Sequence, residues 1–157
     1  IVYAGLMIKN GIPRVLEFNM RMGDPETQPI LFRLTSDLVD IMEAAIDGRL
    51  SQIDVQCDPR PAVCVVMAAG GYPDAYTKGH PIRGLEDAAG VPDTFVFHAG
   101  TALKGGGIVT SGGRVLGVTA RGATIQDAVA AAYRAAERIG WEGVHYRKDI
   151  ARKAFGR

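Results

Sequence analysis

The sequence predicts an α+β fold, and three observations lead to this prediction. Residues 1–20 form two strand-like runs around an Asn10-Gly11 turn, which is the pattern of a β-hairpin. Apolar side chains recur at helical spacing in segments 37–48 and 124–140. Short apolar runs separated by glycine-rich turns lie between these two helices and are typical of a small antiparallel sheet.

The N-terminal hairpin is predicted from strands at 1–8 and 14–20. Side chains alternate between the two faces of a strand, so the second strand should have a polar face and an apolar face. The polar face carries Glu17, Asn19 and Arg21. The apolar face carries Leu16, Phe18 and Met20, which we expect to point into a core.

Two helices are predicted after the hairpin. A short helix is expected from Asp24, as its N-cap, to about Leu34, because Pro25 suits the first helical position. A clearer helix begins after Ser36 or Asp37 and ends at Gly48.

A domain boundary is predicted near residue 60. Segment 51–61 is polar, contains two prolines and has no periodicity, so it divides domain 1–59 from domain 60–157. The strands predicted in the second domain are 62–69, 94–100, 107–110 and 114–121. The last two are expected to pair with each other across Ser111-Gly112-Gly113.

One helix is expected to cover this second sheet. Thr124 and Asp127 have the spacing of a capping box, and Gly140 ends the helix. Its apolar stripe is predicted as Ile125, Val129, Ala132, Tyr133, Ala136 and Ile139. Residues 74–93 are expected to be mostly loop, with 80–82 as a candidate short strand.

Composition argues against several classes of partner. Of the 157 residues, 47% are hydrophobic and 22% are charged, and the formal net charge is +1, so we expect neither nucleic acid nor a membrane as partner. No apolar run is long enough to span a bilayer. Cys57 and Cys64 match neither a zinc spacing nor a disulfide framework, and we therefore expect a cytoplasmic protein.

The polar face of the hairpin is the first candidate site. Glu17 and Asn19 offer carboxylate and amide oxygens, which are ligands that Mg²⁺ prefers. Arg21 on the same face is suited to bind phosphate or carboxylate through two hydrogen bonds, and Asp24 and Glu26 follow in the next turn. A solvated strand face shows the same alternation, so both interpretations stay open on these residues alone.

Longer motifs carry a resemblance to a known family. The stretch LEFNMRMGDPETQPILFRLTSDLVDIMEAA, from Leu16, resembles the signature region of the phosphoribosylamine–glycine ligases of the ATP-grasp superfamily. The resemblance continues in order through VVMAAGGYPDAYTKGHPI, TFVFHAGT, VTSGGRVLGVTARGATIQDAVAAAY and HYRKDIARKA. It covers essentially the whole chain, and it is to the C-terminal portion of these enzymes.

The resemblance implies a domain organisation and a reaction. Residues 1–59 are expected to end an ATP-grasp domain, and residues 60–157 to form a small ligase C-terminal domain. ATP is expected to phosphorylate the carboxylate of glycine. The amine of 5-phosphoribosylamine then attacks glycyl phosphate, giving glycinamide ribonucleotide, ADP and phosphate in purine synthesis.

The resemblance also implies roles for the candidate residues. Glu17 and Asn19 are expected to bind Mg²⁺ (or Mn²⁺) that is held by the phosphates of ATP. Arg21 is expected to act in catalysis on the acyl phosphate or a ligand phosphate. Arg21, Asp24 and Glu26 match a substrate-binding loop, with Asp24 assigned to the amine of phosphoribosylamine or glycine.

The chain departs from the family by what it lacks. The N-terminal domain, the glycine-rich lid, the adenine-binding strands and a second metal carboxylate are not in it, and it begins within a strand, IVYAGLMI, without an initiator methionine. We therefore expect a fragment that is inactive alone and needs the N-terminal part of the enzyme. The alternative is a non-catalytic structural or interaction module that needs a partner chain for ATP binding.

Overall fold

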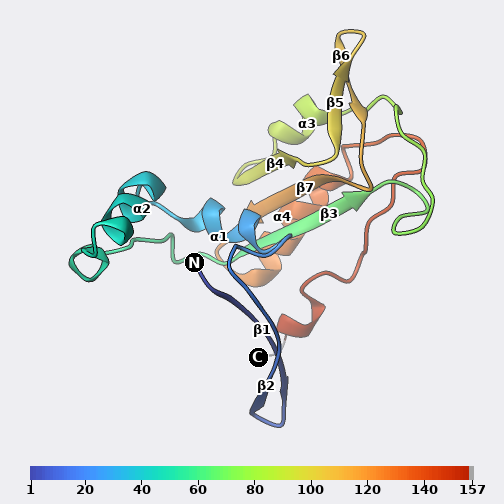
Figure 1. Ribbon diagram of the computed structural model, residues 1–157. Coiled ribbons are helices and arrows are strands. Elements are labelled where there is room, and N and C mark those ends of the chain that lie inside the picture. The colour runs from blue at the N-terminus through green and yellow to red at the C-terminus, as the bar shows by residue number, and fades with distance from the viewer. Residues whose placement is uncertain (156–157) are drawn as a thin grey trace.

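A three-stranded antiparallel sheet forms the centre of the molecule in the computed structural model, which describes residues 1–155 (Figure 1). Its strand order is β3-β7-β4. The strands are β3 (Ala62–Ala68), β7 (Arg114–Arg121) and β4 (Thr94–His98). The predicted α+β class with small antiparallel sheets is confirmed.

The predicted pairing of β7 with the strand immediately before it is wrong. Strand β6 (Gly107–Thr110) pairs with β5 (Thr101–Lys104) in a separate sheet, whereas β7 pairs with β3 and β4. The turn after β6 lies against Gly100, whose carbonyl accepts hydrogen bonds from the amides of residues 111 and 112. A Cβ on Gly100 would lie 2.7 Å from the Cα of Gly112, so this close approach requires glycine.

Helix α4 (Ile125–Ala136) covers one face of the sheet, and its predicted capping box is confirmed. The side chain of Thr124 accepts a hydrogen bond from the amide of Asp127 at 3.1 Å, and the Asp127 carboxylate accepts one from the amide of Thr124 at 3.1 Å. The helix ends before the predicted Gly140. Its buried face is rotated from the predicted stripe and consists of Ala128, Ala131, Ala132, Ala135 and Ala136.

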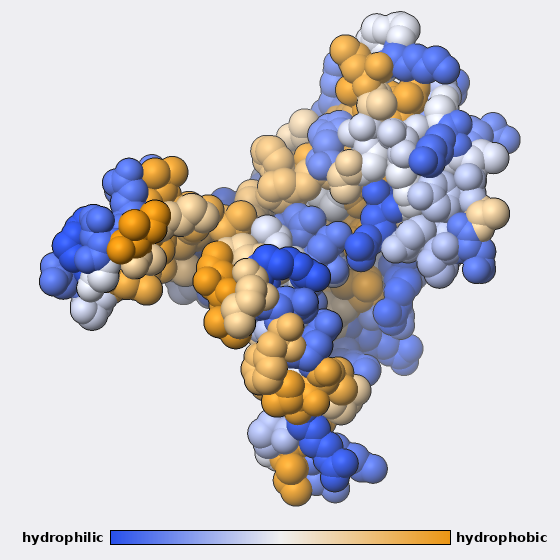
Figure 2. All heavy atoms as spheres, in the orientation of Figure 1, coloured by the Kyte–Doolittle hydropathy of each residue, from blue (hydrophilic) through white to orange (hydrophobic). Residues whose placement is uncertain are grey.

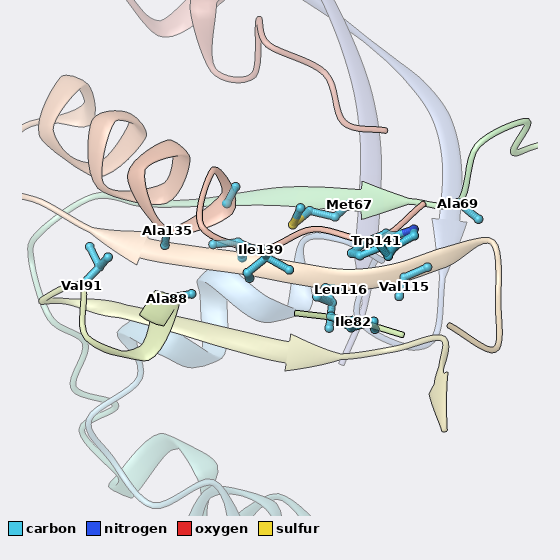
Figure 3. Close-up of a cluster of buried hydrophobic side chains, with 12 residues drawn as sticks. Met67, Ala69, Ile82, Ala88, Val91, Val115, Leu116, Ala135, Ile139 and Trp141 are labelled. Carbon is cyan, nitrogen blue, oxygen red and sulfur yellow. The ribbon is translucent and has the colours of Figure 1, made fainter. Parts of the chain in front are cut away.

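These alanines allow α4 to lie close to the sheet, and the main core fills the space around them. The cluster joins side chains from β3, β7 and the segment after α4, including Met67, Leu116 and Trp141 (Figure 3). Helix α3 (Leu85–Ala89), where the sequence predicted a loop, adds Ala88 to the same core. Gly84 precedes this helix with a φ of +80°, and a Cβ there would overlap the carbonyl of Arg138.

Helix α1 (Thr27–Arg33) lies on the opposite face of the sheet from α4. Gly117 of β7 faces it, since a Cβ on that glycine would meet both Gln28 and the sulfur of Cys64. The prediction that Asp24 caps this helix is wrong. The N-cap position is Glu26, two residues further on, and the Asp24 carboxylate pairs with Arg114.

The N-terminal hairpin of β1 (Tyr3–Lys9) and β2 (Ile12–Asn19) projects from the body of the molecule (Figure 1). Asn10 and Gly11 form its turn with φ of 52° and 76°, as predicted. The expected core face is wrong for this chain. Leu16, Phe18 and Met20 are 66%, 63% and 78% exposed because the hairpin does not lie against the sheet.

Helix α2 (Leu38–Ile46) also projects from the body, and it follows the prediction closely. The Asp37 carboxylate accepts a hydrogen bond from the amide of Val39 at 2.7 Å, and Gly48 follows the helix with a φ of +69°. Short 3-10 helices occur at Leu50–Gln52 and Arg152–Ala154. The division near residue 60 stays a prediction. Within residues 1–155, no helix is long and apolar enough to cross a membrane.

An ion network fastens the end of α1 and the segment before β3 to β7. The Asp58 carboxylate accepts hydrogen bonds from Arg60 Nη2 at 2.7 Å and from Arg121 Nη1 at 3.1 Å. Arg121 also donates to the carbonyl of Phe32 at 3.2 Å, and its guanidinium carbon lies 4.4 Å from the centre of that ring. The hydrogen bonds from Arg60 lower the pKa of Asp58 to about 2.

We expect this network to make stability depend on pH in the acid range. The pKa of Asp58 is lowered from 3.8 to about 2, so its contribution is complete above about pH 4 and is lost as the pH falls toward 2. Asp58→Asn should lower the urea midpoint at pH 7 and flatten the decline of that midpoint across this window. If the urea midpoints of the parent and of Asp58→Asn fell equally between about pH 4 and about pH 2, Asp58 would not be the source of this pH dependence.

A second variant tests the cap of α4. Thr124→Ala should lower the free energy of unfolding by about 1 kcal/mol, because it removes the side-chain acceptor for the Asp127 amide. Chemical denaturation measures this change. Gln126→Ala on the exposed side of the same helix is the matched control and should stay within about 0.5 kcal/mol of the parent.

Candidate functional site

A pocket of about 440 Å³ lies where the hairpin and the loop before α1 meet the start of β7. Four of the five predicted site residues line it: Glu17, Arg21, Asp24 and Glu26. The other lining residues were not predicted as site residues, and they include the side chains of Tyr3 and Arg114. Residues far apart in the sequence therefore form one charged pocket.

Glu17 and Asn19 lie on the same face of β2. In the hairpin register Glu17 is opposite Gly5 and Asn19 is opposite Tyr3. A Cβ on Gly5 would lie 3.0 Å from Cγ of Glu17, so this glycine leaves room for the glutamate side chain. Asn19 is half-buried at the end of the strand and does not line the pocket itself.

The loop before α1 places Glu26 toward the hairpin. The carbonyl of Gly23 accepts hydrogen bonds from the amide of Thr27 at 2.9 Å and from its hydroxyl at 2.5 Å. A Cβ on Gly23 would overlap the Glu26 carboxylate, so the absence of a side chain at this position leaves room for Glu26 in its present place. The phenol of Tyr3 donates to Glu26 Oε1 at 3.1 Å, and this hydrogen bond raises the pKa of Tyr3.

The pocket contains two guanidinium groups. Arg21 donates to the carbonyl of Met22 at 3.1 Å. Arg114 Nη2 lies 3.1 Å from Asp24 Oδ2, and both side chains are about half exposed. Arg114 lies 90 residues from Asp24 in the sequence, and only the position of β7 brings them together. No local spacing in the sequence indicates this pair.

The donor set fits a cation that is shared with a bound phosphate. Among residues 1–155, no three His, Cys, Asp or Glu side chains form a group that could hold a metal ion. Glu17 and Asn19 supply oxygens on one strand face, and Mg²⁺ sites commonly combine one or two such ligands with phosphate oxygens and water. Metal binding by these two residues stays a prediction.

Glycines and histidines outside this pocket have structural explanations. A Cβ on Gly70 would lie 2.7 Å from the carbonyl oxygen of Gly143, so close backbone packing accounts for that glycine. His80 and His98 each share a hydrogen bond with a nearby threonine hydroxyl, Thr77 and Thr101 respectively. Residues 104–107 form the turn between β5 and β6.

Comparison with known proteins shows the family to which the chain belongs. The sequence family described as "Phosphoribosylglycinamide synthetase, C domain" matches residues 62–153, and the chain belongs to this family. Over 157 residues it is 57% identical to the phosphoribosylamine–glycine ligase of Pseudomonas aeruginosa, and over 156 residues it is 53% identical to that of Rhodopirellula baltica. Each match covers 99% of this chain and 36% of the relative.

A solved structure agrees with these matches. The crystal structure of phosphoribosylamine–glycine ligase from Thermotoga maritima is similar to this chain with a TM-score of 0.71 and 38% identity. The similarity covers 94% of this chain and 36% of that one. The chain therefore spans about a third of the length of the relatives it matches and corresponds to their C-terminal portion.

The Tyr3–Glu26 hydrogen bond can be tested directly. Glu26→Gln should lower the pKa of Tyr3 toward its ordinary value of 10.0, because the neutral amide neither repels the phenolate nor accepts as strong a hydrogen bond. NMR titration of labelled tyrosine rings resolves this change. Tyr146 is the internal control, since burial is the main cause of its raised pKa and should be unaffected. An unchanged pKa of Tyr3 in Glu26→Gln would contradict the hydrogen bond between these two side chains.

Proposed function

We propose that this chain is the C-terminal part of a phosphoribosylamine–glycine ligase, an ATP-dependent carbon–nitrogen ligase of purine synthesis with an ATP-grasp core. One observation carries the proposal. Carboxylates and guanidinium groups from the hairpin, the loop before α1 and β7 line a single pocket in a chain of this family. Such a pocket suits the binding of phosphate and amine groups.

The proposed reaction has two steps. A carboxylate oxygen of glycine bonds to the γ-phosphorus of ATP, and the bond to ADP breaks. The amine nitrogen of 5-phosphoribosylamine then bonds to the acyl carbon of glycyl phosphate, phosphate leaves, and the nitrogen loses a proton. The products are glycinamide ribonucleotide, ADP and phosphate.

The residues of this chain take distinct parts in the proposal. Glu17 and Asn19 would hold Mg²⁺ or Mn²⁺, and the bound cation would neutralise and orient the phosphates of ATP. Arg21 stabilises negative charge on the transferred phosphoryl group. Asp24 and Glu26 bind the amine of the substrate, since carboxylates accept hydrogen bonds from ammonium and amine groups.

The exposed apolar surface supports the presence of a further polypeptide segment. Apolar side chains gather on the hairpin and on α2 (Figure 2), including Phe18, Met20 and Ile46. Exposed patches of this kind mark contact surfaces. We propose that the N-terminal part of the ligase covers them and supplies the nucleotide pocket. A reducing cytoplasm suits the two free thiols, of which Cys64 is buried.

Glu17→Ala tests the proposed metal role in the longest gene product that contains this chain. We expect the loss of nearly all ADP formation with glycine and phosphoribosylamine, because the Mg²⁺–ATP complex loses its carboxylate ligand. Raising the Mg²⁺ concentration should recover part of the turnover. Glu86→Ala on the exposed side of α3 is the matched control and should leave turnover unchanged. Near-normal turnover of Glu17→Ala at low Mg²⁺ would overturn the assignment.

The same assay separates the proposal from its alternative. If the unmutated gene product forms no ADP under these conditions, the ligase proposal fails. The exposed apolar faces would then support the second interpretation, a non-catalytic module that binds a partner chain through the hairpin and α2.

A further inference from the structure

Arg114 is the point at which the central sheet reaches the pocket. Among the residues that the structure describes, it is the one pocket-lining side chain that comes from the segment matched by the family, 62–153. Its backbone is firmly placed, because it pairs with Ala68 of β3 and is followed by the buried Val115 and Leu116. The side chain is nevertheless 43% exposed and available to a ligand.

The partner of Arg114 is exchangeable. Asp24 Oδ2 lies 3.1 Å from Arg114 Nη2, but the two side chains are 52% and 43% exposed, and an ion pair in that environment contributes little stability. A phosphate dianion carries more charge than a carboxylate and accepts two parallel hydrogen bonds from a guanidinium. It can therefore replace Asp24 at low cost.

The charges of the pocket favour a ligand with both an anionic group and an amine. Three carboxylates, from Glu17, Asp24 and Glu26, lie with the guanidinium groups of Arg21 and Arg114. Within the proposed function, phosphoribosylamine and glycine both carry an amine and an anionic group, whereas ATP offers several phosphates without a basic amine. A pocket of about 440 Å³ is far larger than glycine requires.

We infer that Arg114 binds the phosphate group of a phosphorylated amine substrate, taking it in exchange for Asp24. The exchange frees the Asp24 carboxylate to accept a hydrogen bond from the amine of the same substrate. Asp24 therefore holds Arg114 in position before the ligand arrives and contacts the substrate afterwards. This inference rests on the proposed function for the identity of the substrate, phosphoribosylamine.

Opposite effects of two variants test the exchange in the longest gene product that contains this chain. Ribose 5-phosphate is the probe, with ribose and ATP as comparisons, and calorimetry measures the affinities. Arg114→Ala should weaken ribose 5-phosphate binding by about tenfold or more, which is the usual effect of losing a charge-assisted pair. Asp24→Asn should strengthen it, because the phosphate no longer competes with a carboxylate.

Control variants separate binding from folding. Arg114→Lys keeps the positive charge but loses the planar guanidinium group. It should therefore bind ribose 5-phosphate more tightly than Arg114→Ala and less tightly than the parent. Arg134→Ala, on the exposed side of α4, should leave the affinity for ribose 5-phosphate unchanged. Under turnover, Arg114→Ala should raise KM for phosphoribosylamine and leave KM for ATP and glycine within about twofold.

Several results would overturn the inference. These are unchanged binding of ribose 5-phosphate in Arg114→Ala, weaker binding in Asp24→Asn, equal binding of ribose and ribose 5-phosphate, or a rise in KM confined to ATP or glycine. The calorimetric arm does not require turnover. A gene product that binds ribose 5-phosphate through Arg114 but forms no ADP would therefore retain the phosphate site and reject the ligase reaction.

Discussion

The structure depends on the central position of β7. This strand pairs along its length with β3 on one side and β4 on the other, and its alternate side chains contact helices on opposite faces. Its buried residues, among them Leu116 and Val118, form the core beneath α4. The arginines at its two ends contact the segment that carries α1, since Arg114 pairs with Asp24 before the helix and Arg121 donates to the carbonyl of Phe32 near its end.

The two arginine contacts differ in a way that matches their roles. Arg121 is about one-quarter exposed, stacks on an aromatic ring and belongs to a network that includes Asp58 and Arg60, so several contacts fix its position. Arg114 is more exposed, and its single carboxylate partner faces a pocket. One end of β7 therefore holds α1 in place, while the other end is accessible to a ligand.

The candidate site follows from this arrangement because none of its contributors forms a pocket alone. The hairpin supplies Tyr3 and Glu17, the loop before α1 supplies Asp24 and Glu26, and the sheet supplies Arg114. In the proposed ligase, the small sheet would therefore contribute to substrate binding as well as to support. The projecting hairpin and α2 carry exposed apolar side chains, which suits a protein whose relatives extend well beyond this segment.

Local signals in the sequence determined the elements that depend on neighbouring residues. The Asn10-Gly11 turn, the Asp37 cap and the Thr124–Asp127 capping box were all predictable, because each is a contact within a few residues. Four of the five predicted site residues line one pocket because they lie close together in the chain. Only the tertiary structure decided three other features: the pairing of β7, the Arg114–Asp24 contact and the exposure of Phe18. Each depends on which distant segments meet, and side-chain periodicity shows which face of a strand is apolar but not what covers it.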